Sequence, residues 1–217
     1  MIPTITTFGW VPEFARGLVR DLRPRWAFEE VGQPYKVDLI TIEESKGPGH
    51  RRYQPFGQVP AYRDEEVSIF ESGAMVLRIA ERAGKLIPAD PSGRARAVQW
   101  LLAALNTIEP ALMALMVNDV FEADQAWSKP RHARLAAFVR TRLGELEAAL
   151  GDKQWLDGST FTVGDLMMIT ALRELHHTGE LKAVPRLAAY VARGESRPAF
   201  RKALADHMAV FDTPAAA

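Results

Sequence analysis

Residues 54–62 of the chain read QPFGQVPAY and residues 70–73 read FESG, and these two stretches are the most informative part of the sequence. Pro60 has no N–H group, so it does not fit the middle of a sheet ladder as an ordinary strand residue. A cis bond between Val59 and Pro60 would turn the Val59 backbone outward, where an extended peptide can pair with it. Ser72 is expected to begin a helix, and free N–H groups at a helix start attract a carboxylate.

The two stretches, in this order and at this spacing, resemble the glutathione-site pattern of cytosolic glutathione S-transferases. That pattern is Asn-Pro-x-Gly-x-Val-Pro-x-Leu, followed by a hydrophobic residue, Glu-Ser and a small residue. Residues 155–165 (WLDGSTFTVGD) resemble the second signature of the same family, and residues 197–200 (RPAF) resemble the start of its last helix. The resemblance implies a thioredoxin-like α/β domain followed by an all-α domain.

The first part of the chain has the patterning that this fold requires. β-branched residues predict a strand over 2–8, alternation predicts another over 35–39, and residues 59–63 and 67–70 predict a hairpin. Helical spacing predicts a helix that closes at Gly32 and a second helix from Ser72 to Ala83. Pro24 is expected either in the first turn of the first helix or at a kink, if that helix starts earlier. The polar residues 43–53 predict a loop or a short helix.

After a linker predicted at residues 84–93, every convincing pattern is helical. Apolar spacing predicts a long helix from Val98 that is kinked at Pro110, and another that ends at Gly151. Residues 118–130 are expected to be a loop or a broken helix end. Thr162 and Asp165 predict a capping box at the start of a core helix. The predicted domains are 1–83 and 94–217.

The composition excludes several classes of protein. Hydrophobic residues make up 47% and charged residues 25% of the 217 residues, as in a soluble globular protein. Lys plus Arg and Asp plus Glu are 27 each, so bulk charge favours neither nucleic acid nor an anionic membrane. The chain contains no cysteine, which excludes disulfides and thiolate nucleophiles of its own. No run long enough to span a bilayer, no secretory signal and no metal site are expected.

The resemblance assigns roles in binding glutathione as a co-substrate. The Val59 backbone, presented by Pro60, would exchange hydrogen bonds with the cysteinyl part. Glu71 would hold the γ-glutamyl ammonium and Ser72 the γ-glutamyl carboxylate, while Gln58 would reach the glycyl end. Arg51 and Arg52 are weaker candidates for the glycyl carboxylate. The alternative interpretation is structural, with Glu71 and Ser72 as a helix cap and Pro60 as a turn proline.

The sequence departs from the family where the thiol is activated. Most members place Ser, Tyr or Cys after the first strand or at the start of the first helix, whereas the corresponding residues 18–21 are Leu, Val, Arg and Asp. Thr7, beside Thr6, is the nearest hydroxyl but is expected to belong to a strand. We therefore expect Arg20, or Arg16, and backbone N–H groups after Gly9 to stabilise the thiolate.

The resemblance also implies a small hydrophobic electrophile as second substrate, a homodimer and a cytoplasmic location. Trp10, Asn106 and Met113, with Trp127 as an addition, are the expected residues of the electrophile pocket. The sequence does not choose between conjugation and a glutathione-dependent reductase, isomerase or dehalogenase reaction. The alternative of a different class is a non-catalytic protein-interaction module with this fold, which the absent hydroxyl favours and the glutathione pattern opposes.

Overall fold

The computed structural model describes residues 2–212 and divides the chain into two compact units. The first unit comprises Met1–Leu86 and Arg197–Ala217, and the second comprises Ile87–Ser196. The division into domains 1–83 and 94–217 stays a prediction, and the packing adds that the last helix groups with the first unit. Each unit is described below by itself.

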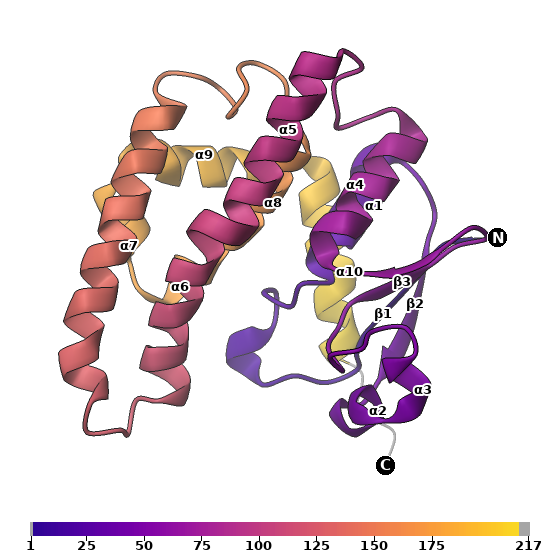
Figure 1. The fold of residues 1–217 in the computed structure, drawn as a ribbon, viewed down its shortest axis with the longest axis horizontal. Helices are drawn as coiled ribbons and strands as arrows, with labels where there is room; N and C mark the ends of the chain where they lie inside the picture. Colours follow the sequence, from indigo (N-terminus) through magenta and orange to yellow (C-terminus); the bar gives the residue numbers. More distant parts are fainter. Residues whose placement is uncertain (1, 213–217) are drawn as a thin grey trace. The chain divides into compact units, whose positions relative to one another are not determined.

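The first unit contains a four-stranded sheet in the order β2-β1-β3-β4 (Figure 1). Strand β1 is parallel to β2 and antiparallel to β3, and β3 and β4 form an antiparallel hairpin. The elements are β1 (Thr4–Phe8), η1 (Glu13–Ala15), α1 (Leu22–Val31), β2 (Lys36–Ile40), α2 (Ile42–Lys46), α3 (Pro48–Arg51), β3 (Ala61–Arg63), β4 (Ser68–Phe70), α4 (Ser72–Ala83) and α10 (Pro198–Asp212). This arrangement confirms the predicted thioredoxin-like fold.

Local chemistry explains the bounds of α1 and α4. Helix α1 ends at Gly32, which has φ 75°, a left-handed conformation that glycine adopts without the cost that a side chain imposes. Pro24 lies in the first turn of α1, where a missing N–H removes no intrahelical hydrogen bond. Helix α4 buries Met75, Val76 and Ile79, the apolar stripe that predicted it.

Helix α10 packs against α1 within this unit (Figure 1). The rings of Trp26 and Phe200 meet edge to face at 4.8 Å between centroids. Arg197 donates two hydrogen bonds to the Glu30 carboxylate, at 2.6 and 2.7 Å. An aromatic contact and a bidentate ion pair thus attach the C-terminal helix to the first helix.

The described part of the second unit is built from helices and their connections (Figure 1). Its elements are α5 (Pro91–Ala103), η2 (Ala104–Ile108), α6 (Glu109–Met116), η3 (Val117–Phe121), α7 (Ser128–Leu150), α8 (Val163–Leu172), η4 (Arg173–His177), η5 (Glu180–Ala183) and α9 (Pro185–Glu195). Helix α8 packs against α5 and α9 and is buried along its whole length.

The predicted capping box begins α8. The Thr162 hydroxyl accepts from the Gly164 N–H at 3.2 Å, and the Asp165 carboxylate accepts from the Thr162 N–H at 2.9 Å. Asp165 also accepts from the Leu156 N–H at 2.8 Å and the Tyr190 hydroxyl at 3.0 Å. Burial raises the pKa of the Asp165 carboxyl, while these donors act in the opposite direction. The box therefore joins three separate segments of the unit.

The predicted kink near Pro110 takes the form of a π-helical segment, η2, between α5 and α6. Pro110 has no N–H to donate to the carbonyl four residues earlier, that of Asn106. A π-helical segment accommodates this missing hydrogen bond, because its N–H groups donate to the carbonyl five residues earlier instead of four. A second π segment, η3, precedes the turn that leads into α7.

One helical run, Pro91–Phe121, is long and apolar enough to cross a membrane by length and composition. The most apolar window has a mean hydropathy of 1.6, and 39% of it is buried inside the protein. The expectation that no run has sufficient length was therefore wrong on these two criteria. A core helix of a soluble protein passes the same test, so the finding is weak evidence for a membrane.

Candidate functional site

The N-terminus of α4 is the first feature of the candidate site, and it lies in the first unit. Ser72 begins the helix and is 4% exposed, and its hydroxyl accepts a hydrogen bond from the Arg23 guanidinium at 3.1 Å. The first N–H groups of an α-helix have no partner within the helix and favour negative charge. A buried cation and a helix N-terminus therefore coincide, an arrangement that suits a carboxylate.

Glu71, the residue before α4, has a strained backbone. Its φ is 70° and its ψ is 115°, a region that residues with a side chain rarely adopt. Such conformations cost about 1–3 kcal/mol and concentrate at functional sites. The Glu71 side chain is exposed, so an accessible carboxylate stands beside the buried Ser72 hydroxyl.

The turn before β3 is shaped by one buried amide side chain. The Gln54 Oε1 atom accepts from the Phe56 N–H at 2.7 Å and from the Gln58 N–H at 3.2 Å. Gly57 has φ 63°, and a Cβ atom there would lie 2.8 Å from the Ser45 carbonyl oxygen. Only glycine avoids both the strain and the clash, which explains its place in the quoted motif.

Helices α2 and α3 hold the same turn from the other side. The Lys46 ammonium donates to the Gly57 carbonyl at 2.7 Å, and a ring nitrogen of His50 lies 2.7 Å from the Gln58 carbonyl. Arg51 donates to the carbonyls of Lys46 and Pro55 at 3.0 and 3.2 Å. The Arg51 guanidinium thus takes part in shaping the turn.

The Val59–Pro60 peptide bond is cis, the geometry that the sequence suggested. Strand β3 begins only at Ala61, after the proline. Within residues 2–212, no hydrogen bond to the Val59 backbone is present, and the residue is half-buried. The Val59 N–H and carbonyl are thus unpaired groups in the turn that leads into a strand.

The segment between β1 and α1 is fixed by the C-terminal helix. The Gly17 N–H donates to His207 Nε2 at 3.2 Å, while His207 Nδ1 lies 3.2 Å from Asp21 Oδ2. The Arg25 Nε–H donates to the same Asp21 oxygen at 2.7 Å. Burial opposes ionisation, but the hydrogen bond from His207 and the hydrogen bond and charge of Arg25 hold the pKa of the Asp21 carboxyl below its ordinary value.

The sequence-predicted thiolate residues lie on both sides of η1. Thr7 is in β1, opposite Leu39, and is 2% exposed; its hydroxyl has no hydrogen-bond partner among residues 2–212. Arg20 is half-buried just before α1. The Arg16 guanidinium lies 5.7 Å from the centre of the Phe211 ring. Their roles toward a thiolate stay predictions.

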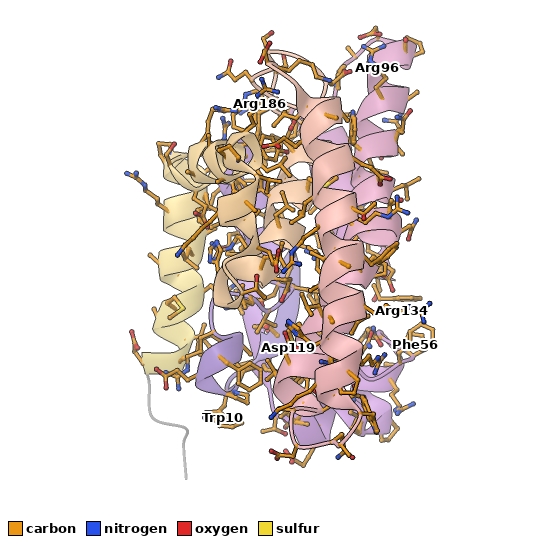
Figure 2. All side chains as sticks on the ribbon, turned by 90° about the vertical axis from the view of Figure 1, so that its left-hand side faces the viewer. Trp10, Phe56, Arg96, Asp119, Arg134 and Arg186 are labelled. Atoms are coloured by element: carbon orange, nitrogen blue, oxygen red, sulfur yellow. The ribbon has the colours of Figure 1, made fainter. Side chains whose placement is uncertain are left out.

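The residues expected around the electrophile fall in different units. Trp10 belongs to the first unit and is 54% exposed at the surface (Figure 2). Asn106 is exposed in η2, Met113 is half-buried in α6, and Trp127 is 44% exposed just before α7, all in the second unit. Their grouping around one substrate stays a prediction.

Sequence reasoning missed several residues that build the site: Arg23, Gln54, His50 and His207. Gln54 lies inside the stretch 54–62, and an amide side chain shortly before a glycine is a signal for a turn in which the side chain accepts hydrogen bonds from the backbone. Arg23 and His207 carry no such signal, because their partners lie 49 and 190 residues away along the chain. Among the described side chains, which are those of residues 2–212 without His177, no group of three or more His, Cys, Asp or Glu is arranged to hold a metal ion.

Comparison with known families finds two matching models. The model of the glutathione S-transferase N-terminal domain matches residues 6–81, and that of the glutathione S-transferase C-terminal domain matches residues 129–193. Glutathione S-transferase PARB of Nicotiana tabacum is 30% identical over 182 residues, which cover 77% of this chain and 83% of the relative. Glutathione S-transferase F10 of Arabidopsis thaliana is 31% identical over 170 residues, covering 72% and 75%.

Solved structures of low sequence identity share the fold. A glutathione transferase from Burkholderia graminis, with two glutathione molecules bound per subunit, superposes with a TM-score of 0.83 at 23% identity, covering all of this chain and 90% of that one. A glutathione transferase from Pseudomonas putida, with one glutathione disulfide bound per subunit, has a TM-score of 0.81 at 19% identity, covering 94% and 90%.

Proposed function

Because the chain belongs to the glutathione S-transferase family, we propose that its first unit binds glutathione and that the protein transfers the glutathione thiolate to a small hydrophobic electrophile. The proposal rests on two features seen together: the Val59 backbone has no hydrogen-bond partner, and helix α4 begins at Ser72. The two features match a peptide backbone and a carboxylate a few atoms apart on one ligand.

The proposed pose uses opposite charges at the γ-glutamyl end. The γ-glutamyl carboxylate accepts from the Ser72 hydroxyl and the first N–H groups of α4, with the Arg23 guanidinium beside them. The γ-glutamyl ammonium meets the Glu71 carboxylate. The strain at Glu71 supports this role, since a backbone outlier at a helix start needs a reason other than stability.

The rest of the ligand follows from the turn geometry. The cysteinyl N–H and carbonyl pair with the Val59 backbone, in the manner of a strand added to a sheet edge. The glycyl end lies toward Gln58, whose carbonyl and N–H are held by His50 and Gln54. The turn is thereby pre-organised, which reduces the ordering cost of binding.

The reaction begins with transfer of the cysteinyl thiol proton to water, since the thiolate is the nucleophile. The thiolate then forms a new S–C bond to the electrophile, and either a leaving group departs with the electron pair of the broken bond or the pair moves onto the substrate. In the absence of a hydroxyl or thiol at 18–21, stabilisation of the sulfur anion falls to Arg20 and to backbone N–H groups. Within the first unit, Trp10 is the proposed contact to the electrophile.

We also propose a homodimer in the cytoplasm. Phe56 supports an interface because it is 63% exposed (Figure 2) on a turn that Gln54 fixes, with its ring 6.0 Å from that of Phe70. A large rigid aromatic at the surface is the kind of residue that interfaces bury. Phe56→Glu should then shift the sedimentation coefficient toward the monomer while leaving the circular dichroism spectrum unchanged.

Glutathione titration and turnover together test the proposed function. The parent protein should bind glutathione in a calorimeter and accelerate its conjugation to chlorodinitrobenzene over the uncatalysed rate. Binding without turnover with any electrophile would support the alternative, a non-catalytic interaction module. Absence of binding would refute the proposed function as a whole.

A second titration, with glutathione disulfide, addresses the reductase reaction. The structures from Burkholderia graminis and Pseudomonas putida hold two glutathione molecules and one glutathione disulfide per subunit, respectively. If the parent bound the disulfide more tightly than glutathione and reduced mixed disulfides faster than it conjugated electrophiles, the reductase reaction would replace conjugation in the proposal.

A further inference from the structure

Residues 16–21, between η1 and α1, are held by two side chains from the far end of the chain. His207 uses both ring nitrogens, one on the Gly17 N–H and one on the Asp21 carboxylate, each at 3.2 Å. A ring that accepts at Nε2 and donates from Nδ1 is neutral, with its proton on Nδ1. His207 is 1% exposed and Asp21 is fully buried, so water does not compete for these bonds.

Phe211, one turn after His207, completes this contact. Its ring meets the His207 ring edge to face at 5.1 Å between centroids, and the Arg16 guanidinium lies 5.7 Å from its centre. Helix α10 thus touches the segment at its start, through Arg16 and Gly17, and at its end, through Asp21. We call His207 and Phe211 the α10 clamp.

The clamped segment adjoins the proposed glutathione site. Asp21 is followed directly by the first turn of α1, from which Arg23 bonds to the Ser72 hydroxyl. Residues 17–21 read GLVRD and offer no hydroxyl or thiol to the glutathione sulfur. Donors from the backbone, and a cation such as Arg20, stabilise an anion more strongly when they are fixed in place before it forms, because no free energy is then spent on reorganising them.

We propose that His207 is a positioning residue for the glutathione thiolate, which acts by fixing the backbone of residues 17–20 through the Gly17 N–H. The inference rests on the proposed function, and it goes beyond it by naming a residue at the opposite end of the chain. The two hydrogen bonds of the ring have different roles. The bond to the Asp21 carboxylate orients the imidazole, and the bond from the Gly17 N–H restrains the backbone at the start of the segment.

Substitution of His207 separates these two bonds. In His207→Asn the shorter amide reaches Asp21, which keeps the carboxylate paired, but does not reach Gly17. In His207→Gln the longer side chain offers its amide oxygen to the Gly17 N–H and its amide NH₂ group to the Asp21 carboxylate. Phe200→Leu is the matched control, because Phe200 is equally buried on α10 but packs on Trp26 rather than on the segment.

Two measurements are made on each protein. Amide hydrogen exchange by NMR follows the Gly17 N–H without any ligand, and titration of the thiolate absorbance gives the pKa of bound glutathione. We expect faster exchange at Gly17 in His207→Asn and a thiol pKa raised by about one unit, a tenfold loss of thiolate below that pKa. His207→Gln should restore both values, and Phe200→Leu should lower stability without moving the thiol pKa.

The inference is overturned if Gly17 exchanges faster in His207→Asn while the thiol pKa equals that of the parent. It is also overturned if Phe200→Leu raises the thiol pKa as much, because the effect would then be general destabilisation. Should His207→Asn not fold, Phe211→Leu decides: a raised thiol pKa supports the clamp and an unchanged one refutes it. Failure of the parent to bind glutathione appears before any variant is made, and it refutes the proposed function as well.

Discussion

The Arg23 guanidinium, in the first turn of α1, donates a hydrogen bond at 3.1 Å to the hydroxyl of Ser72, the first residue of α4. Both residues are buried: Arg23 is 3% exposed and Ser72 is 4% exposed. A cation buried at a helix N-terminus adds to the positive end of the helix dipole rather than offsetting it. A carboxylate bound at this helix N-terminus would be attracted by the Arg23 guanidinium and by the helix dipole together.

Arg23→Met should therefore weaken glutathione binding. Methionine fills a similar volume without charge, so the loss is that of one charge-assisted interaction, roughly 10- to 100-fold in Kd for about 1.5–3 kcal/mol. Calorimetry measures it, and Arg134→Met, an exposed arginine on α7 (Figure 2), is the control that should bind as the parent does. An unchanged Kd in a folded Arg23→Met protein would show that the carboxylate does not bind at Ser72.

Arg20→Ala should raise the pKa of bound glutathione more than Thr7→Val does. Arg20 supplies a positive charge next to α1, whereas the Thr7 hydroxyl is buried on β1 without a partner. Valine keeps the shape of threonine and removes only that hydroxyl, so the Thr7 variant should also retain its stability. Titration of the thiolate absorbance compares the two. A larger upward shift in Thr7→Val would restore the hydroxyl mechanism and refute the charge-based one.

Asp165→Ala should destabilise the second unit by roughly 3 kcal/mol, because it leaves buried donors of Leu156, Thr162 and Tyr190 without an acceptor. Tyr190→Phe removes one of these bonds and should cost about 1 kcal/mol. Urea denaturation measures both values. Equal midpoints and slopes for Asp165→Ala and the parent would show that the box does not stabilise the unit.

The Asp64 carboxylate should make stability depend on pH in the acid range. Burial opposes its ionisation, but hydrogen bonds from Arg78 and from the Glu66 and Val67 N–H groups outweigh burial and lower its pKa. Because the pKa of Asp64 is lower in the folded state than in the unfolded state, the ionised carboxylate stabilises the folded protein at pH values above the unfolded pKa of about 3.9. This stabilisation is lost as the pH falls below about 3.9 toward the folded pKa.

Asp64→Asn should accordingly be less stable than the parent at neutral pH, and the gap in the free energy of unfolding should narrow as the pH falls below about 3.9. Urea denaturation at a series of pH values gives the gap directly. Asp152→Asn, whose side chain is 94% exposed, is the control and should show no gap at any pH. A gap that stays constant, or widens in acid, would contradict the assignment of Asp64 as a stabilising carboxylate.

The fold was predictable from local patterns because each pattern depends on neighbours in the sequence. The bounds of α4 and the N-cap of α8 are as predicted, since apolar spacing and the Thr162–Asp165 box determine them. The π segment η2 was foreseen only as a kink, because Pro110 removes a donor without specifying how the helix rearranges.

The site was predictable only in part, and the reason is again distance along the chain. Glu71, Ser72 and Val59 fall in motifs whose spacing carries information. The Arg23–Ser72 and Gly17–His207 hydrogen bonds join residues from different elements, and no periodicity specifies which polar side chains will meet in a core. The packing of α10 on α1 likewise depends on tertiary contacts that no local sequence pattern specifies.

Calorimetric titration of glutathione into the parent and into Glu71→Ala tests whether the γ-glutamyl end binds at Glu71 and Ser72. We expect that the parent binds and that Glu71→Ala, correctly folded, binds roughly 10- to 100-fold more weakly, through loss of one charge-assisted hydrogen bond of about 1.5–3 kcal/mol. Asp152→Ala, which removes an exposed carboxylate elsewhere, should match the parent. An affinity of Glu71→Ala for glutathione equal to that of the parent would contradict a γ-glutamyl site at Glu71.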